Sequence, residues 1–143
     1  MKLPDANLFL YAADETSARH AAARAWVEAA LSGSETVALA WTVLLAFLRI
    51  GTNPAVFERP LAAEDALDLI DGWLGQPCSV VVHPTDRHSA VLRELLAPLG
   101  AAGNLTSDAH LAALAIEHGA ELCSCDSDFS RFGGLRWVDP LAA

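Results

Sequence analysis

Long hydrophobic runs are missing from this 143-residue sequence, and no apolar stretch is long enough to span a bilayer. The N-terminus also lacks the basic segment followed by an apolar segment that marks a signal peptide, so we expect a cytoplasmic protein. Hydrophobic residues make up 53% of the chain and charged residues 19%, a balance typical of a globular protein. The length suits a single domain, residues 1–143, with a core of its own.

Cysteine is also scarce, since the chain has only Cys78, Cys123 and Cys125. Cys123 and Cys125 alternate on an apparent strand, so their side chains should point to opposite faces, which disfavours a disulfide between them. A C-x-C pair without a nearby Cys or His partner is weak evidence for zinc. We interpret the three as small buried residues.

Positive charge is in short supply as well. The 9 Lys and Arg residues face 18 Asp and Glu residues, which gives a net charge of −9. Because Lys and Arg drive phosphate binding, this balance disfavours a general nucleic-acid binder. An enzyme acting on nucleic acid would need metal ions at its site or a local basic rim. A basic protein or peptide partner would suit the surface better.

Several common catalytic motifs are absent. The sequence has no G-x-x-x-x-G-K-[ST] loop, no G-x-G-x-x-G and no G-x-S-x-G elbow. The five histidines show no metal-ligand spacing. We interpret His110 and His118 as helix-surface or capping residues.

Short strand-like segments alternate with helical ones, which predicts an α/β fold with a parallel sheet covered on both faces. The predicted strands are a short one ending at Asp5, then 35–40, 78–82, 120–126 and 135–139. The predicted helices are one directly after Asp5, then 16–33, 41–50, 62–75, 85–100 and 105–119. The apolar segments 41–50 and 78–82 are expected to be buried. The expected N-caps are Thr16 or Ser17, Thr85, and Thr106 or Ser107.

Four aspartates lie where such a fold places its sites. Asp5 ends the first strand, Asp126 ends a late strand with Asp128 just beyond it, and Asp108 lies in the first turn of a helix. Sites in parallel sheets gather outside the carboxyl ends of the strands, so these side chains could converge. Taken singly, Asp5 could cap a helix and Asp108 could interact with a helix dipole. Asp126 and Asp128 could equally form a polar turn.

Convergence of these acids would be destabilising without a counter-charge. Two carboxylates about 4 Å apart repel by about 1 kcal/mol in water and by about 4 kcal/mol at an effective dielectric constant of 20. Hard divalent cations with oxygen ligands offset such repulsion, and Mg²⁺ suits a site that retains waters and takes a substrate phosphate as a further ligand. Such a site can generate hydroxide and stabilise charge on a phosphodiester.

Three segments carry a resemblance to a known family: "PDANLFLYAAD", "WTVLLAFLRIGTNPAVF" and "LTSDAHLAALAIEHGAELCSCDSDFSRFGGLRWVDPL". Through them the sequence resembles PIN-domain proteins, specifically the VapC-type ribonuclease toxins of bacterial toxin–antitoxin pairs. The resemblance implies a three-layer α/β/α domain with a short central parallel sheet that dimerises, binds Mg²⁺ or Mn²⁺ and cuts RNA. It also implies a cognate VapB-type antitoxin whose tail occupies the active-site groove.

The resemblance also assigns roles to the aspartates. Asp5 resembles the family's first acid and Asp108 its third, and these two are expected to ligate the metal directly. Asp126 resembles the fourth acid and is expected to contact the ion as well. Asp128 beside it would serve as an auxiliary ligand or hold the attacking water. These four form the predicted catalytic set.

Supporting residues are expected around these acids. Asn7 and Thr106 occupy positions from which they could orient the carboxylates. Ser124 would lie near the end of the strand, without an assigned role. The candidates for contacting RNA phosphates are Arg49, Arg131 and Arg136, each of which could equally form a surface salt bridge.

One position departs from the family pattern. The family usually places a Glu on the buried helix, in a pattern like "LLEFLRI", whereas this chain reads "LLAFLRI" with Ala46. Alanine cannot ligate a metal, orient its water or accept a proton. Either this is an active-site variant made or selected so that a toxic enzyme can be produced, or a natural protein has lost the acid. We expect the fold and antitoxin binding to survive while metal affinity and cleavage fall, by about 10- to 100-fold or more.

Two other functions fit parts of the pattern. The loss at Ala46 is compatible with a non-catalytic module that keeps only antitoxin or RNA binding. A phosphatase of the haloacid dehalogenase type would also begin with an Asp after the first strand. It would want a second acid two residues later, where this chain has Asn7.

Overall fold

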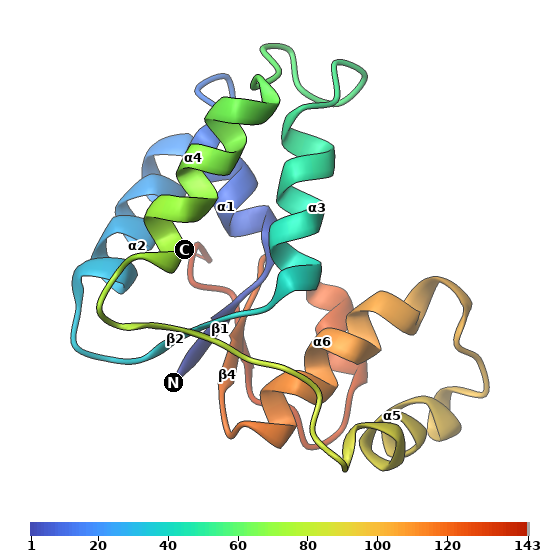
Figure 1. The fold of residues 1–143 in the computed structure, drawn as a ribbon. Helices are drawn as coiled ribbons and strands as arrows, with labels where there is room; N and C mark the ends of the chain where they lie inside the picture. The colour runs from blue at the N-terminus through green and yellow to red at the C-terminus, as the bar shows by residue number, and fades with distance from the viewer. Residues whose placement is uncertain (143) are drawn as a thin grey trace.

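The computed structural model describes residues 1–142 and has a five-stranded sheet at its centre (Figure 1). All neighbouring strands pair in parallel, in the order β3-β2-β1-β4-β5. The strands are β1 Lys2–Pro4, β2 Val37–Leu39, β3 Ser79–Val81, β4 Glu121–Cys123 and β5 Trp137–Val138. The predicted parallel α/β sheet is therefore confirmed.

The order of the strands reverses beside β1. The chain passes from β1 to β2 and β3 on one side, then returns to place β4 against the other side of β1. The register pairs Leu3 with Leu122 and Pro4 with Cys123, so β1 and β4 end side by side. Parallel sheets open a crevice at such a point, beyond the carboxyl ends of the strands.

Six α-helices in residues 1–142 cover the sheet. Figure 1 shows α1 to α4 together on one side of the sheet, with α5 and α6 on the other. The helices are α1 Ala6–Ala13, α2 His20–Ser32, α3 Trp41–Gly51, α4 Ala63–Leu74, α5 His88–Leu96 and α6 Thr106–Glu117. Short 3₁₀ helices are η1 Ala97–Leu99, η2 Gly103–Leu105 and η3 Ser127–Arg131. The layers match the predicted three-layer arrangement, and none of these helices is long and apolar enough to cross a membrane.

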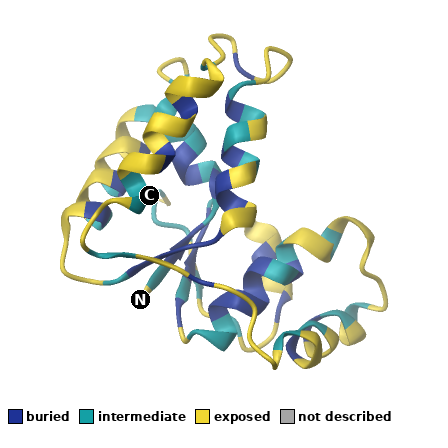
Figure 2. Cartoon of the chain, viewed as in Figure 1, coloured by how far each residue is buried: buried dark blue, intermediate teal, exposed yellow. Residues whose placement is uncertain are grey.

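The hydrophobic core lies between the sheet and its helices, where the buried positions of Figure 2 face inward. Leu3 and Leu122 on neighbouring strands are completely buried. The rings of Phe9 and Phe47 pack on Trp73, with centroids 4.3 and 4.8 Å apart. Burying a large apolar side chain contributes about 1.5–3 kcal/mol. This packing fixes where β1 and β4 end, and so where the polar residues beyond them lie.

The predicted N-caps are wrong for three helices. Helix α2 begins at His20, because the Asp14 carboxylate accepts hydrogen bonds from the N–H and the hydroxyl of Thr16 and holds that segment in a turn. The predicted alternative, Ser17, likewise lies before the helix. Helix α5 begins after Arg87, since the hydroxyl of Thr85 donates to Glu117 at 2.6 Å.

Helix α6 likewise lacks the predicted cap. The 3₁₀ helix η2 continues directly into α6, so Thr106 is already its first helical residue and Ser107 its second. Leu105 precedes the helix and makes no side-chain cap bond. The hydroxyl-bearing residues at this end are therefore inside the helix and available for other contacts.

Two segments expected to be buried are only partly so. Strand β3 pairs with β2 alone and forms one edge of the sheet, which leaves Val80 and Val81 41% and 38% exposed. Helix α3 buries Val43 and Phe47 but exposes 45% of Trp41 and 56% of Leu45. The apolar sequence of the two segments correctly predicted a strand and a helix. It gave no sign that one face of each element is exposed to solvent.

Candidate functional site

The ends of β1 and β4 carry the main polar side chains of the site. Asp5 follows β1, and its backbone N–H donates to the carbonyl of Cys123, 2.8 Å away, at the end of β4. Asp126 comes three residues beyond β4, and Asp108 lies in the first turn of α6. The sheet register therefore brings together residues that are more than one hundred positions apart in sequence.

The aspartates gather as predicted, with one difference in membership. Asp108, Asp126 and Asp128 each offer a carboxylate oxygen, and these oxygens lie within 4.8 Å of one another. Asp5 was expected in this innermost group and is not a member of it. It is close enough for its charge to act on Asp108.

Asp5 is held in place by its own hydrogen bonds. Its Oδ1 accepts from the N–H of Ala6 at 2.7 Å, which caps helix α1. Its Oδ2 accepts from Ser124 Oγ at 2.7 Å and from Asn7 Nδ2 at 3.4 Å. Burial raises the pKa of the Asp5 carboxyl, against the opposing effect of the hydrogen bonds from Ser124 and Ala6. The capping interpretation is thus confirmed for Asp5, and the residue lies beside the acid cluster.

Ser124 is the residue that links these groups. It is completely buried, the one buried polar residue in residues 1–142. Besides donating to Asp5, its Oγ accepts from Asn7 Nδ2 and from the N–H of Asp126, both at 3.0 Å. Asn7 Oδ1 in turn accepts from the N–H of Cys125 at 3.3 Å. A serine inside an apolar strand was the available signal, because a buried hydroxyl requires partners.

Asp126 and Asp128 form a turn and also belong to the cluster. Asp126 Oδ1 accepts from the N–H of Asp128 at 2.9 Å and begins the 3₁₀ helix η3. Arg131 offsets part of the local charge, with its Nη2 3.5 Å from Asp128 Oδ1. The polar-turn alternative is therefore compatible with a cluster of acids.

Asp108 experiences the charge of the cluster most strongly. Burial raises the pKa of its carboxyl to about 6, and repulsion from the other three aspartates adds to the effect. A divalent cation would remove this repulsion, and carboxylate oxygens are the ligands that Mg²⁺ and Mn²⁺ prefer. The donor set therefore fits such an ion, with Asp108, Asp126 and Asp128 best placed to hold it and Asp5 beside them.

Of the remaining predicted site residues, some contact the aspartates and others have different surroundings. Asn7 does contact Asp5, as expected. Thr106 is exposed at the start of α6 and lines a different hollow, next to His110. Ala46 is half-buried in α3 and packs against the core. Arg136 donates to the carbonyl of Gly119 at 2.6 Å and so is engaged at the other end of α6.

The cysteines and histidines need one correction each. Burial raises the pKa of Cys123 to about 12 and that of Cys125 to about 11, but Cys125 is only half-buried, as is Cys78. His118 is the C-terminal cap of α6, as predicted. His110 is half-buried and does not cap a helix, and its Nδ1 lies 2.8 Å from a nitrogen of His88.

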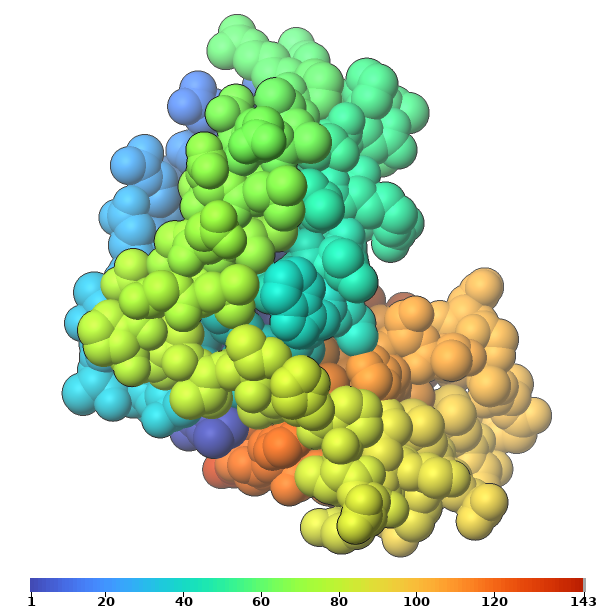
Figure 3. All heavy atoms as spheres, viewed as in Figure 1, coloured from blue at the N-terminus to red at the C-terminus, as the bar shows by residue number. Residues whose placement is uncertain are grey.

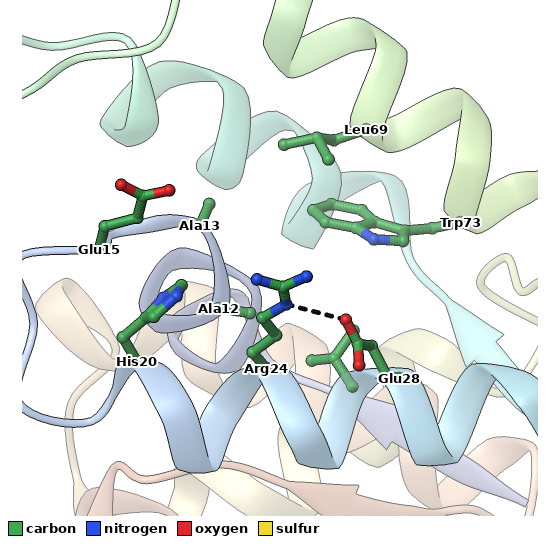
Figure 4. A pocket seen from close by; sticks show the side chains of 9 residues that line it. Ala12, Ala13, Glu15, His20, Arg24, Glu28, Leu69 and Trp73 are labelled. Atoms are coloured by element: carbon green, nitrogen blue, oxygen red, sulfur yellow. Dashed lines mark hydrogen bonds and ion pairs between the residues drawn. The ribbon is translucent and has the colours of Figure 1, made fainter.

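A separate groove runs between α2 and α4, away from the aspartates. Figure 4 shows Leu69 and Trp73 of α4 facing Arg24 and Glu28 of α2, with an Arg24–Glu28 ion pair of 2.9 Å. Two adjoining hollows of about 320 and 450 Å³ share this wall. None of the four predicted catalytic aspartates lines either hollow.

The chain is similar to known proteins over nearly its whole length. The PIN domain profile matches residues 2–135. Ribonuclease VapC37 of Mycobacterium tuberculosis is 48% identical over 142 residues, which cover 99% of each chain. Ribonuclease VapC33 of the same species is 40% identical over 141 residues, again 99% of each.

Solved structures share the fold at low sequence identity. VapBC2 from Rickettsia felis, bound to a DNA fragment from its promoter, has a TM-score of 0.68 and 21% identity, over 96% of both chains. The sarcin–ricin loop cleaving toxin VapC20 of Mycobacterium tuberculosis has a TM-score of 0.62 and 19% identity, over 95% of this chain and 99% of that one.

Proposed function

Because the chain belongs to the PIN-domain family, we propose that it is an endoribonuclease toxin of the VapC type that hydrolyses RNA phosphodiester bonds with Mg²⁺ or Mn²⁺. The observation that carries the proposal is the meeting of Asp108, Asp126 and Asp128 within 4.8 Å, beyond the ends of β1 and β4. Family membership sets aside the phosphatase alternative, whose second acid is replaced by Asn7.

In this proposal Asp108 and Asp126 hold the ion, Asp128 contacts the ion or the attacking water, and Asp5 completes the ligand set from beside them. When bound at these residues, the ion would supply a water of lowered pKa and would neutralise charge that develops on the phosphate. Ser124 and Asn7 orient Asp5 through the hydrogen bonds they donate to its Oδ2. These contacts would keep the carboxylates at fixed separation while substrate binds.

Two side chains near the cluster have further roles in the proposal. Asp108, whose pKa is about 6, can bind and release a proton near neutral pH. Arg131 lies at the edge of the cluster, paired with Asp128 in an exposed position. In the proposal its guanidinium leaves the Asp128 carboxylate and binds an RNA phosphate when substrate arrives.

Ala46 bears on how fast this chain is expected to cleave RNA. We propose that cleavage by this chain is weaker than in relatives that have the acid, because no other acidic residue occurs on α3. The second candidate is a module that binds antitoxin or RNA without cutting. The same substitution favours it, and one experiment separates the two.

The experiment compares RNA cleavage by the native chain and by Ala46→Glu, each with Mg²⁺ or Mn²⁺. We expect Ala46→Glu to cut about 10-fold faster or more. Asp5→Ala in the Ala46→Glu background should abolish the gain, and Asp65→Ala, an exposed acid of α4, should not. If both the native chain and Ala46→Glu are inert on structured RNAs, the nuclease proposal is wrong and the binding module is favoured.

We propose a VapB-type antitoxin as the partner of this chain. We also propose that the chain forms a homodimer and acts in the cytoplasm. Besides the tail expected at the active site, the groove between α2 and α4 supports a second contact, with a basic amphipathic segment of the antitoxin. Its floor is apolar, and α4 carries Glu64, Asp65, Asp68 and Asp71 without a basic residue. The one arginine that lines the groove, Arg24, is already paired with Glu28.

Two leucines of α4 give a matched test of this contact. Leu69 lines the groove and is 38% exposed, whereas Leu67 is 40% exposed and lines neither hollow of the groove. We expect Leu69→Asp to weaken antitoxin binding about 10-fold or more, as loss of a buried anchor does. Leu67→Asp should bind normally in the same titration. Equal affinity of both variants would place the contact elsewhere.

A further inference from the structure

Helix α6 carries a second group of ionisable side chains, apart from the aspartates. Glu117 Oε1 accepts from the N–H and the hydroxyl of Thr85, at 2.9 and 2.6 Å. Its Oε2 lies 2.5 Å from His88 Nδ1, and His88 Nε2 lies 2.8 Å from His110 Nδ1. The Glu117 side chain has no exposed surface, although the residue as a whole is only partly buried. This series of contacts joins α5 to α6 and fixes the orientation of both imidazole rings.

The two rings form part of the wall of a hollow of about 400 Å³ between α3, α5 and α6. In Figure 3 the surface is notched where α3, in teal, meets α6, in orange. The residues that line the hollow are Thr42, His88, Leu92, Thr106, Ser107 and His110. None of these is acidic, although the protein carries a net charge of −9.

The chemistry of this lining fits a flat heteroaromatic ring. Most of its surface is apolar, and its polar groups are two imidazoles and three hydroxyls. Unpaired RNA bases are bound by stacking on aromatic side chains, His included, and by hydrogen bonds to their edges. A metal ion fits less well, because the facing nitrogens of His88 and His110 already bond each other. A phosphate fits less well too, since no Lys or Arg lines the hollow.

The hollow and the aspartate cluster share the first turn of α6. Ser107 lines the hollow, and Asp108, the next residue, belongs to the cluster. A base in the hollow and a phosphodiester at the aspartates would therefore lie at the same end of this helix.

We propose that this hollow binds an unpaired base of the RNA substrate next to the bond that is cut, with His88 and His110 as its platform. The inference rests on the proposed ribonuclease function and adds to it the origin of base preference. Glu117 is a positioning residue here, because it orients His88 and through it His110.

Binding to the hollow can be measured without cleavage. The full chain, with labelled histidine and labelled backbone amides, is titrated by NMR with each of the four nucleoside 5′-monophosphates in EDTA. We expect the largest shifts at the rings of His88 and His110 and at the Ser107 amide, with one base preferred. The rings should not respond to inorganic phosphate.

Two variants and a control sharpen this titration. Thr42→Trp fills the hollow from an exposed position at the start of α3, and His110→Leu removes one ring. Each should lower the affinity for the preferred nucleotide by about 5- to 150-fold, the usual value of a stacked base. His118→Ala, at the other end of α6, should leave it unchanged.

The proposal is overturned by the absence of a shift at either ring with any nucleotide, and also by unchanged affinity in Thr42→Trp. If His110→Leu does not fold, Thr42→Trp still decides. Shifts confined to residues around Asp108 would mean that only the phosphate is bound, and would equally overturn it.

Cleavage separates this inference from the function on which it rests. On RNA with randomised unpaired sequence, Thr42→Trp should lose the preference for one base at one position. An unchanged preference would overturn the inference and leave the nuclease function standing. Absence of cleavage by the native chain and by Ala46→Glu would instead remove the nuclease function, and the nucleotide titration would still decide about the hollow.

Discussion

Helix α6 carries two clusters of ionisable side chains that are built in opposite ways. In its first turn Asp108 meets Asp126 and Asp128, three like charges within 4.8 Å. Further along, Glu117 meets His88 and Thr85, which donate hydrogen bonds to it. The two clusters share one helix, so their difference comes from their partners and not from their secondary structure.

The pKa values of the two acids record this difference. Burial raises the pKa of Asp108 to about 6, with repulsion from its neighbours adding to it. The pKa of Glu117 is lowered, because hydrogen bonds from Thr85 and His88 outweigh the effect of burial. A satisfied carboxylate stabilises the fold, whereas a like-charged cluster destabilises it until a cation binds. The aspartate cluster is therefore the one expected to bind a ligand such as a divalent cation.

The largest expected effect follows from removing one charge of the aspartate cluster. Asp126→Asn should lower RNA cleavage by about 100-fold or more, because it removes a proposed metal ligand. The free energy of unfolding in EDTA should not fall, since repulsion is relieved. Cleavage assays and urea unfolding on the same samples check both expectations, with Asp68→Asn on α4 as control. An active Asp126→Asn would exclude this residue from the catalytic set.

The opposite result is expected for the complementary cluster. Glu117→Ala leaves the donors of Thr85 and His88 without an acceptor and should lower the free energy of unfolding by about 2–4 kcal/mol. Glu94→Ala, an exposed acid of α5, should change it by less than about 0.5 kcal/mol. Urea unfolding measures both variants. A small effect of Glu117→Ala would mean that the two clusters are energetically alike.

Divalent cations should stabilise one cluster only. At a Mg²⁺ concentration 100 times the dissociation constant, binding adds about 2.7 kcal/mol to the free energy of unfolding. Asp108→Asn should lose most of this gain, and Glu117→Ala should keep it. Thermal unfolding with Mg²⁺, Mn²⁺ or EDTA provides the measurement. An identical gain in Asp108→Asn would show that the ion binds elsewhere.

The smallest expected effect is on pH dependence. The pKa of Asp108 is raised from 3.8 to about 6, so the folded state binds its proton more tightly than the unfolded state. Its contribution is therefore most favourable below about pH 4, declines as pH rises to about 6, and is constant above that. Because the side chain is only partly buried and solvent screens its charge, we expect only about 1 kcal/mol. The difference between the native chain and Asp108→Asn in EDTA, followed from pH 7 to pH 4, should show this slope.

Much of the fold could be predicted from local sequence. Alternating apolar segments gave the five strands and the parallel sheet, because each segment is short and ends at residues that break a strand. The helix starts were less predictable. Thr85 and Thr16 have the chemistry of caps, but their hydroxyls bond to Glu117 and Asp14 instead. The edge position of β3 was also invisible, since Val80 and Val81 read as buried.

The sequence by itself determined which residues could form an acidic site, because Asp5, Asp108 and Asp126 each stand at the end or start of a predicted element. Only the tertiary structure decided their roles. The register between β1 and β4 places Ser124 against Asp5, and so leaves Asp128 in the innermost group in place of Asp5. It also brings His88 to His110 across two helices. Contacts of this kind depend on the packing of distant segments, which local patterns of hydrophobicity and charge do not encode.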